Sequence, residues 1–181
     1  MTTVGNLPEI PSLADMDAGG RGGAWPNGWY RGTILPSYTG QSGRTFETDD
    51  TESQKGDSRN LRVIVAVANA EGEIRTIFHR VNYRDNDLTA ERIAEVRTAR
   101  QTYAKEYANK RWPDTDAQRT SLALASLGQL EKVMGRTFTR NGNGLDTTPL
   151  HNQTADVYLG TDEKGFNEVR QVAPSGTKVR S

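Results

Sequence analysis

Arginine and aromatic side chains recur through residues 58–83, SRNLRVIVAVANAEGEIRTIFHRVNY. Apolar residues alternate with other residues in both halves of this stretch, which predicts two strands that each bury one face. The polar residues 69–72 predict a hairpin loop of four residues, with Val67 opposite Ile74. The exposed face of that hairpin carries Arg62, Ile64, Arg75, Ile77, His79, Val81 and Tyr83. Cations and a phenol among flat apolar side chains suit contact with phosphates and unstacked bases.

A second pairing of this hairpin is also open. A three-residue loop with a bulge shifts the pairing by one residue, because side chains alternate between the faces of a strand. The second strand would then expose Phe78 and Arg80.

Other candidate contact residues precede the hairpin. Residues 28–37, GWYRGTILPS, predict a strand with Trp29 and Arg31 on one face. Residues 38–57 are a long connection that is expected to act as a flap over the binding face, with Tyr38, Arg44, Phe46 and Lys55 as its useful residues. The acidic side chains of this connection, Asp49, Asp50 and Glu52, are expected to form a solvated tip.

The full set of predicted contact residues combines phosphate-binding cations with rings that stack on bases. Its members are Trp29, Arg31, Arg44, Arg62, Arg75, His79, Arg80, Tyr83, Arg84 and Lys164, with Phe46 and Phe166 as further rings.

The charge balance restricts this hypothesis to a local surface. The formal net charge is zero, with 23 basic and 23 acidic residues. Residues 58–111 carry 11 basic and 7 acidic side chains, whereas residues 1–57 carry 4 and 8. The basic excess therefore lies on the hairpin and the segment after it.

Motifs of enzymes and metal sites are missing from the sequence. It has no cysteine and two histidines, and it contains no P-loop, GxSxG or HExxH pattern. We expect neither catalysis nor a metal or other cofactor. The sequence shows no signal peptide and no apolar run of membrane-spanning length, so a cytoplasmic location is expected.

The remaining elements complete one domain. A flexible arm is predicted over 1–27 with Trp25 attaching it to the domain, a folded domain over 28–174, and a flexible tail over 175–181. Thr89 is expected to cap a first helix, Thr115 a second that ends at Gly135, and the two to form a helical hairpin over about 89–135. Residues 153–160 and 166–173 predict two more strands.

This order of elements, β-β-β-α-α-β-β, predicts a mainly β fold with a helical insertion, of the α+β class. It is the order of the OB-fold, a five-stranded and partly open barrel. Ligands of that fold lie across its second and third strands, which here form the hairpin of residues 58–83.

The sequence also resembles the phage-encoded single-stranded-DNA-binding OB-fold proteins. The resemblance spans roughly residues 28–174. It rests on GWYRGTI, KGDSRNLRVIVAV, LGQLEKVMG, and a closing pattern of LHN, QTADVYLG, a Lys-Gly turn and FNEVRQVAP. This chain departs from the family in its long helical segment, and it ends in KVRS, where many members carry an acidic tail that recruits partners.

The resemblance implies a sequence-tolerant protein that coats and protects single-stranded DNA during phage replication or recombination, in the host cytoplasm. RNA binding, self-association and contacts with replication or recombination proteins stay open. The alternative is a phage structural, assembly or host-interaction protein that uses the same barrel for protein contacts.

Overall fold

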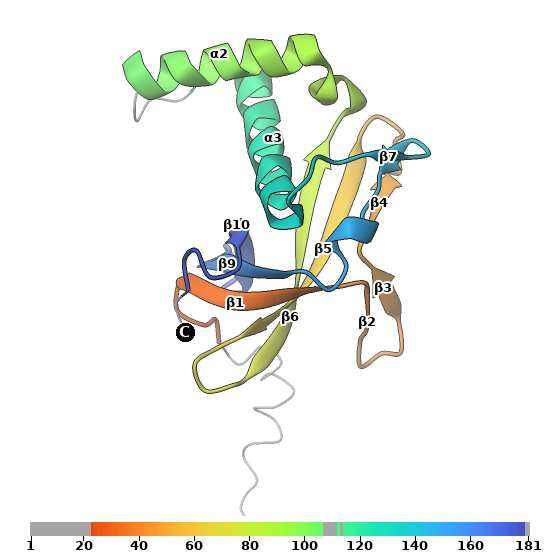
Figure 1. Ribbon diagram of the computed structural model, residues 1–181, viewed down its shortest axis with the longest axis vertical. Coiled ribbons are helices and arrows are strands. Elements are labelled where there is room, and N and C mark those ends of the chain that lie inside the picture. The colour runs from red at the N-terminus through yellow and green to blue at the C-terminus, as the bar shows by residue number, and fades with distance from the viewer. Residues whose placement is uncertain (1–22, 107–111, 113, 180–181) are drawn as a thin grey trace, which may run out of the picture.

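The long strands pair into one antiparallel sheet (Figure 1). The computed structural model describes residues 23–106, 112 and 114–179. The long strands are β1 (Gly28–Leu35), β5 (Arg59–Ala68), β6 (Ile74–Tyr83), β9 (Thr154–Thr161) and β10 (Asn167–Pro174). β1 pairs with β5 on one edge and with β9 on the other, β6 pairs with β5, and β10 pairs with β9. The five predicted strands are therefore confirmed.

The described residues form a mainly β structure of the α+β class, as predicted. The sheet is open: among these residues, β10 ends the pairing order on one side, β4 (Asp49–Glu52) and β6 both pair with β5 on the other, and neither pairs with β10. A barrel is therefore not confirmed.

The core lies between the inner face of the sheet and one helix. Leu61, Val63, Val65 and Val67 of β5 are all 1% exposed or less, as predicted, but Ile64 of the opposite face is also fully buried, so its predicted exposure is wrong. Helix α3 (Thr115–Met134) packs against β6 and β10 and shares this core, in which Leu130 is completely buried. Burying such a side chain contributes roughly 1.5–3 kcal/mol.

The two α-helices of the described residues are joined to the sheet through α3. Helix α2 (Ala90–Glu106) follows a 3-10 turn, η1 (Asp85–Leu88), and lies across the end of α3 away from the strands (Figure 1). The predicted helical hairpin is thus a crossed pair of helices.

Helix capping differs from the prediction at one of three positions. The hydroxyl of Thr89 accepts a hydrogen bond from the Arg92 N–H at 3.2 Å, so its predicted capping role is confirmed. Gly135 ends α3 in the left-handed conformation at φ 72°, also as predicted. The predicted cap Thr115 is wrong, because Asp114 accepts the Ala117 N–H at 3.0 Å and a carboxylate is a strong N-cap.

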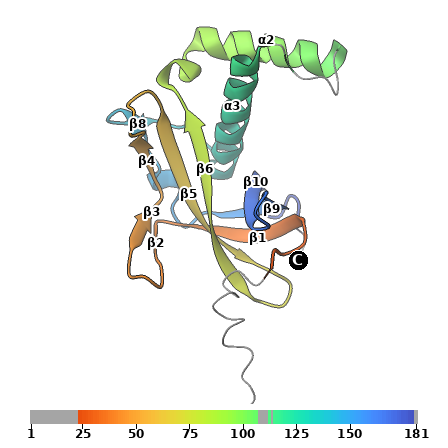
Figure 2. The ribbon, with the colours of Figure 1, turned by 180° about the vertical axis from the view of Figure 1, so that it is seen from behind.

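Residues 38–57 are ordered by short strands, so the interpretation of a long loop is wrong. β2 (Ser37–Thr39) pairs with β3 (Thr45–Glu47), and β4 (Asp49–Glu52) pairs with the first part of β5. The buried hydroxyl of Thr48 donates to the Leu35 carbonyl at 2.6 Å and accepts the Ile64 N–H at 2.9 Å. The β2–β3 hairpin is thereby fixed beside β5 (Figure 2).

The remaining short elements lie beside β4 and α3. They are β7 (Arg140–Asn141), β8 (Gly144–Leu145) and a second 3-10 turn, η2 (Thr148–Leu150). β8 packs against β4 and η2 against α3. The Thr147 hydroxyl donates to the Thr48 carbonyl at 2.9 Å, which ties this segment to the start of β4.

Both terminal segments are attached to the sheet where the structure describes them. Residues 1–22 of the predicted arm and 180–181 of the predicted tail lie outside the described residues. Trp25 is 8% exposed, and its backbone N–H donates to the Asn167 side chain at 2.8 Å, so the expected attachment by Trp25 is confirmed. At the other end, the Lys178 and Val179 N–H groups donate to the buried Asp156 carboxylate.

Candidate nucleic-acid interface

The register of the β5–β6 ribbon decides which side chains face solvent. Val67 lies opposite Arg75 and Ile64 opposite Phe78, so the predicted pairing of Val67 with Ile74 is wrong. The alternative prediction of a three-residue loop with a bulge is confirmed: the Asn69 N–H donates to the Glu73 carbonyl at 3.0 Å, which leaves residues 70–72 as the turn, and Gly72 has a φ of 84°. This loop shifts the register by one residue and so reverses the faces of β6.

Three aromatic and three arginine side chains gather on the outer face of the ribbon. This outer cluster consists of Tyr38 from β2, Arg44 and Phe46 from the β2–β3 hairpin, Arg62 from β5, and Phe78 and Arg80 from β6. The Phe78 ring lies at its centre, 5.0 Å from Phe46 and 6.4 Å from Tyr38 between ring centroids, both edge to face. All three rings are half-buried, so part of each remains accessible.

The arginines of the outer cluster lie over its rings. The guanidinium carbon of Arg44 is 4.8 Å from the Phe46 centroid, and that of Arg80 is 5.4 Å from the Phe78 centroid. Arg62 lies 5.3 Å from Phe46 and 5.9 Å from Phe78. Cation–π contacts of this kind orient the guanidinium planes without using up their hydrogen-bond donors.

The cations differ in how far their charge is compensated. Arg62 is 26% exposed, donates to the Glu47 carbonyl at 2.9 Å, and lies 3.4 Å from the Asp49 carboxylate. Arg44 and Arg80 are exposed, and no described carboxylate forms an ion pair with either. The positive charge available to a ligand therefore lies mainly at the hairpin tip and on β6.

A groove of about 540 Å³ continues from the outer cluster along β6. Tyr38, Phe78 and Arg80 line one end, and Phe166 and Asn167 line the other, where Arg75 also borders the groove. Phe166 is 42% exposed, and Lys164 is exposed in the same turn. The groove thus joins the first connection of the fold to the last, although Asp162 and Glu168 give its far wall negative charge.

Arg75 faces the inner side and contacts the start of the chain. Its guanidinium donates to the Gly23 carbonyl at 2.8 Å and to the Asn167 side chain at 3.3 Å, and it lies 4.7 Å from the Trp25 ring centroid. The predicted exposed position of Arg75 on the same face as Arg62 is wrong, because the one-residue register shift places them on opposite faces.

His79 also lies on the inner face and is 7% exposed. Burial lowers the pKa of its imidazole to about 4, from a usual value near 6.5. The ring is therefore neutral at pH 7, and its predicted surface position is wrong.

Tyr83 is completely buried in a polar network around Asp50. The Asp50 carboxylate accepts hydrogen bonds from the Tyr83 hydroxyl, from the Arg59 guanidinium at 2.8 Å and from the Leu145 N–H at 2.9 Å. Burial and the Asp50 carboxylate raise the pKa of the Tyr83 phenol. Stacking of a base on Tyr83 is excluded, and the prediction that Asp50 lies in a solvated tip is wrong.

Arg84 belongs to a network that holds the helices. Its guanidinium pairs with the Asp116 carboxylate, which also pairs with Arg92 at 2.9 Å. Nearby, the buried Asp87 accepts the Arg84 N–H at 2.9 Å and a bond from the Arg119 guanidinium at 3.1 Å. These partners place Arg84 between η1 and α3, apart from the outer cluster.

Trp29 and Arg31 lie on the outer face of β1, as their alternation predicted. They lie beside β9, where Trp29 contacts Tyr158 with ring centroids 5.4 Å apart. The structure therefore divides the predicted residues into four groups. Arg44, Arg62 and Arg80 come together, Trp29 and Arg31 lie at a second position, Lys164 is exposed in the β9–β10 turn, and Arg75, His79, Tyr83 and Arg84 have structural contacts.

Sequence reasoning omitted two rings of the outer cluster from the final set. The alternative register exposes Phe78, and the flap prediction includes Tyr38. The sequence shows that Phe78 is an aromatic residue at an even position of β6. Whether even positions face solvent depends on the length of the preceding loop.

Comparisons with protein-family models, with curated proteins and with solved structures found no match to this chain. Within the described residues, no three His, Asp or Glu side chains converge as metal ligands. None of the helices that the structure describes is both long and apolar enough to cross a lipid bilayer.

Proposed function

We propose that the protein binds single-stranded DNA with little sequence preference, and that the outer cluster is its principal contact surface. The observation that carries this proposal is the Phe78 ring, with Phe46 and Tyr38 beside it and three arginines around it. Stacking of one base on an aromatic side chain contributes roughly 1–3 kcal/mol and tolerates any base.

The geometry favours a single strand over a duplex. Bases in a duplex are already stacked and paired, so flat rings on a sheet reach them only at ends. In a single strand the bases turn onto the rings while Arg44 and Arg80 contact phosphates. The position of the cluster, between the β2–β3 hairpin and a groove that leads to the β9–β10 turn, supports a strand that follows β6.

The proposal includes the fold, which we infer to be a partly open OB-fold. β5 and β6 correspond to the second and third strands of a partly open OB-fold, β9 and β10 to its fourth and fifth, and α2 and α3 to an insertion between them. The pairing order supports the correspondence, because β1 lies between β5 and β9. Ligands of OB-folds lie on strands two and three. The biological role that follows is the coating of strands exposed during phage replication or recombination, in the host cytoplasm.

The test is fluorescence anisotropy with labelled dT oligomers, duplex DNA and RNA of matched length at several salt concentrations. We expect dT to bind more tightly than duplex, with a log-log salt slope of about −1.4, because the Arg44 and Arg80 contacts contribute roughly 0.7 each on a single strand. Equal affinity for RNA would extend the ligand class to both nucleic acids. Absence of dT binding would overturn the proposal and favour a protein-contact role.

A further inference from the structure

A second pair of aromatic rings with cations lies on the outer face of β1 and β9. This β1–β9 patch consists of Trp29, Arg31, Tyr158 and Lys178. Trp29 and Tyr158 are half-buried and pack edge to face, and the Lys178 ammonium lies 5.5 Å from the Trp29 ring centroid. Arg31 and Lys178 are exposed. The patch thus repeats the chemistry of the outer cluster at another position on the sheet.

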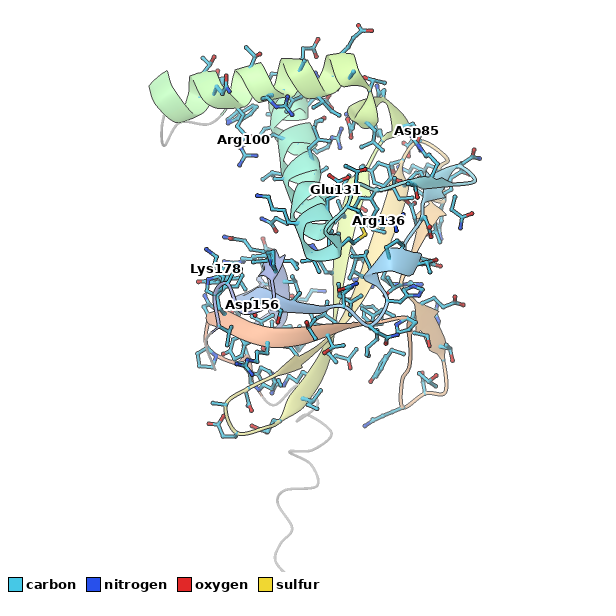
Figure 3. All side chains as sticks on the ribbon, viewed as in Figure 1. Asp85, Arg100, Glu131, Arg136, Asp156 and Lys178 are labelled. Carbon is cyan, nitrogen blue, oxygen red and sulfur yellow. The ribbon has the colours of Figure 1, made fainter. Side chains whose placement is uncertain are left out.

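Lys178 is positioned by a buried carboxylate. Asp156 of β9 is fully buried and accepts backbone N–H groups from Gly176 at 3.2 Å, Lys178 at 2.7 Å and Val179 at 2.8 Å. Burial alone would raise the pKa of this carboxyl, but the three N–H donors and the nearby Arg31 outweigh burial and lower it. Asp156 is therefore ionised at neutral pH, and Figure 3 shows it close to Lys178 at the end of the chain.

The surface between the outer cluster and the β1–β9 patch is lined by small side chains. Register places Phe78, Ile64 and Leu35 in one row across β6, β5 and β1. The next row along β1 contains Thr76, Ala66 and Thr33. These small residues leave a shallow channel of about 410 Å³, which Thr33, Ala66 and Ala68 line together with the larger side chains of Arg31 and the exposed Ile74.

The two sites are close enough for one oligonucleotide to contact both. Leu35 is in the row of Phe78, and Trp29 is six residues before it on β1. At a rise of about 3.3 Å per residue this separation is about 20 Å. A single strand of several nucleotides covers it, and an OB-fold holds about 4–16 nucleotides.

We propose that the β1–β9 patch is a second stacking site for the strand that binds the outer cluster. One base stacks on Trp29 while Lys178 and Arg31 contact phosphates, and the strand crosses the small-residue channel between the two sites. Asp156 acts as a positioning residue by fixing the backbone of Lys178. The inference rests on the proposed function, and it adds a path over β5 and β1 to the groove along β6.

The test compares the affinities of dT4 and dT16 for wild type, Trp29→Leu, Lys178→Gln and Phe78→Leu. Trp29→Leu is expected to weaken dT16 binding on the order of 5- to 100-fold, since one stacked base is lost, and to leave dT4 binding unchanged. Lys178→Gln is expected to reduce the dT16 salt slope by about 0.7. Lys132→Gln, an exposed substitution on α3, is the matched control and leaves the slope unchanged.

The outcomes separate this inference from the proposed function. Wild-type affinity for dT16 in both Trp29→Leu and Lys178→Gln, with weakened binding in Phe78→Leu, would overturn the second site alone. Absence of dT16 binding by wild type would overturn the proposed function. Lys178 is exposed, so its substitution tests the patch even if the Trp29 variant fails to fold.

Discussion

The two faces of the β5–β6 ribbon carry similar residue types in different environments. The inner face has Arg75, His79 and Tyr83, and the outer face has Arg62, Phe78 and Arg80. On the inner face, Arg75 donates to Gly23 and Asn167, His79 is held neutral by burial, and Tyr83 bonds to Asp50. On the outer face, Phe78 is half-buried and Arg80 is exposed.

The difference shows that residue type alone does not make a binding surface. A cation that already has protein acceptors would have to break those bonds to contact a phosphate, and a fully buried phenol cannot reach a base. Arginines over partly exposed rings retain their donors for a ligand. A register shift of one residue is enough to exchange the side chains that face the core with those that face solvent along a strand.

The largest expected effect tests whether the inner face of the ribbon stabilises the fold. Asp50→Ala leaves the Arg59 guanidinium, 11% exposed, without its buried partner, so we expect the free energy of unfolding to fall by about 3–5 kcal/mol. Urea unfolding measures this change. Asp49→Ala on the same strand is the control, because its pair with Arg62 is partly exposed and contributes at most about 1 kcal/mol. Equal losses in both variants would remove the distinction between the two faces.

The next effect concerns the pH dependence of stability. The folded state holds the His79 pKa near 4, against about 6.5 when unfolded, so the unfolded state takes up a proton first as pH falls. This group therefore lowers stability progressively between about pH 6.5 and pH 4, by about 2–3 kcal/mol in total, and has no effect above this range. His79→Leu should lack this component in urea unfolding at pH 7, 5.5 and 4.5. Parallel pH curves for variant and wild type would show that His79 titrates normally.

A smaller effect separates free cations from paired ones. Arg44→Gln combined with Arg80→Gln should make the salt slope of dT binding shallower by about 1.4, since each contact contributes roughly 0.7. Arg84→Gln combined with Arg92→Gln is the matched control and should leave the slope unchanged, because both arginines pair with Asp116, apart from the outer cluster and the groove. A slope that falls equally in the two double variants would contradict the assignment of the phosphate contacts to the outer cluster.

The strands and the outline of the helices follow from sequence because alternation and capping are local properties. The register of β6 does not, since residues 69–73 are compatible with a four-residue loop and with the three-residue loop with a bulge that the structure contains. The Asp50 network was also beyond local reasoning, because Arg59, Tyr83 and Leu145 reach it from separate elements. The outer cluster was partly predictable: its arginines were named, and its rings needed the β2–β3 pairing to bring them together.

The most direct test of the account is the dT16 affinity of Phe78→Leu against that of His79→Leu at pH 7. These neighbouring residues of β6 point to opposite faces and receive the same replacement. We predict that Phe78→Leu weakens binding about tenfold or more, since a stacking ring is lost, and that His79→Leu binds as wild type does. Equal affinity in the two variants, or a larger loss in His79→Leu, would contradict the assignment of the outer face as the binding surface.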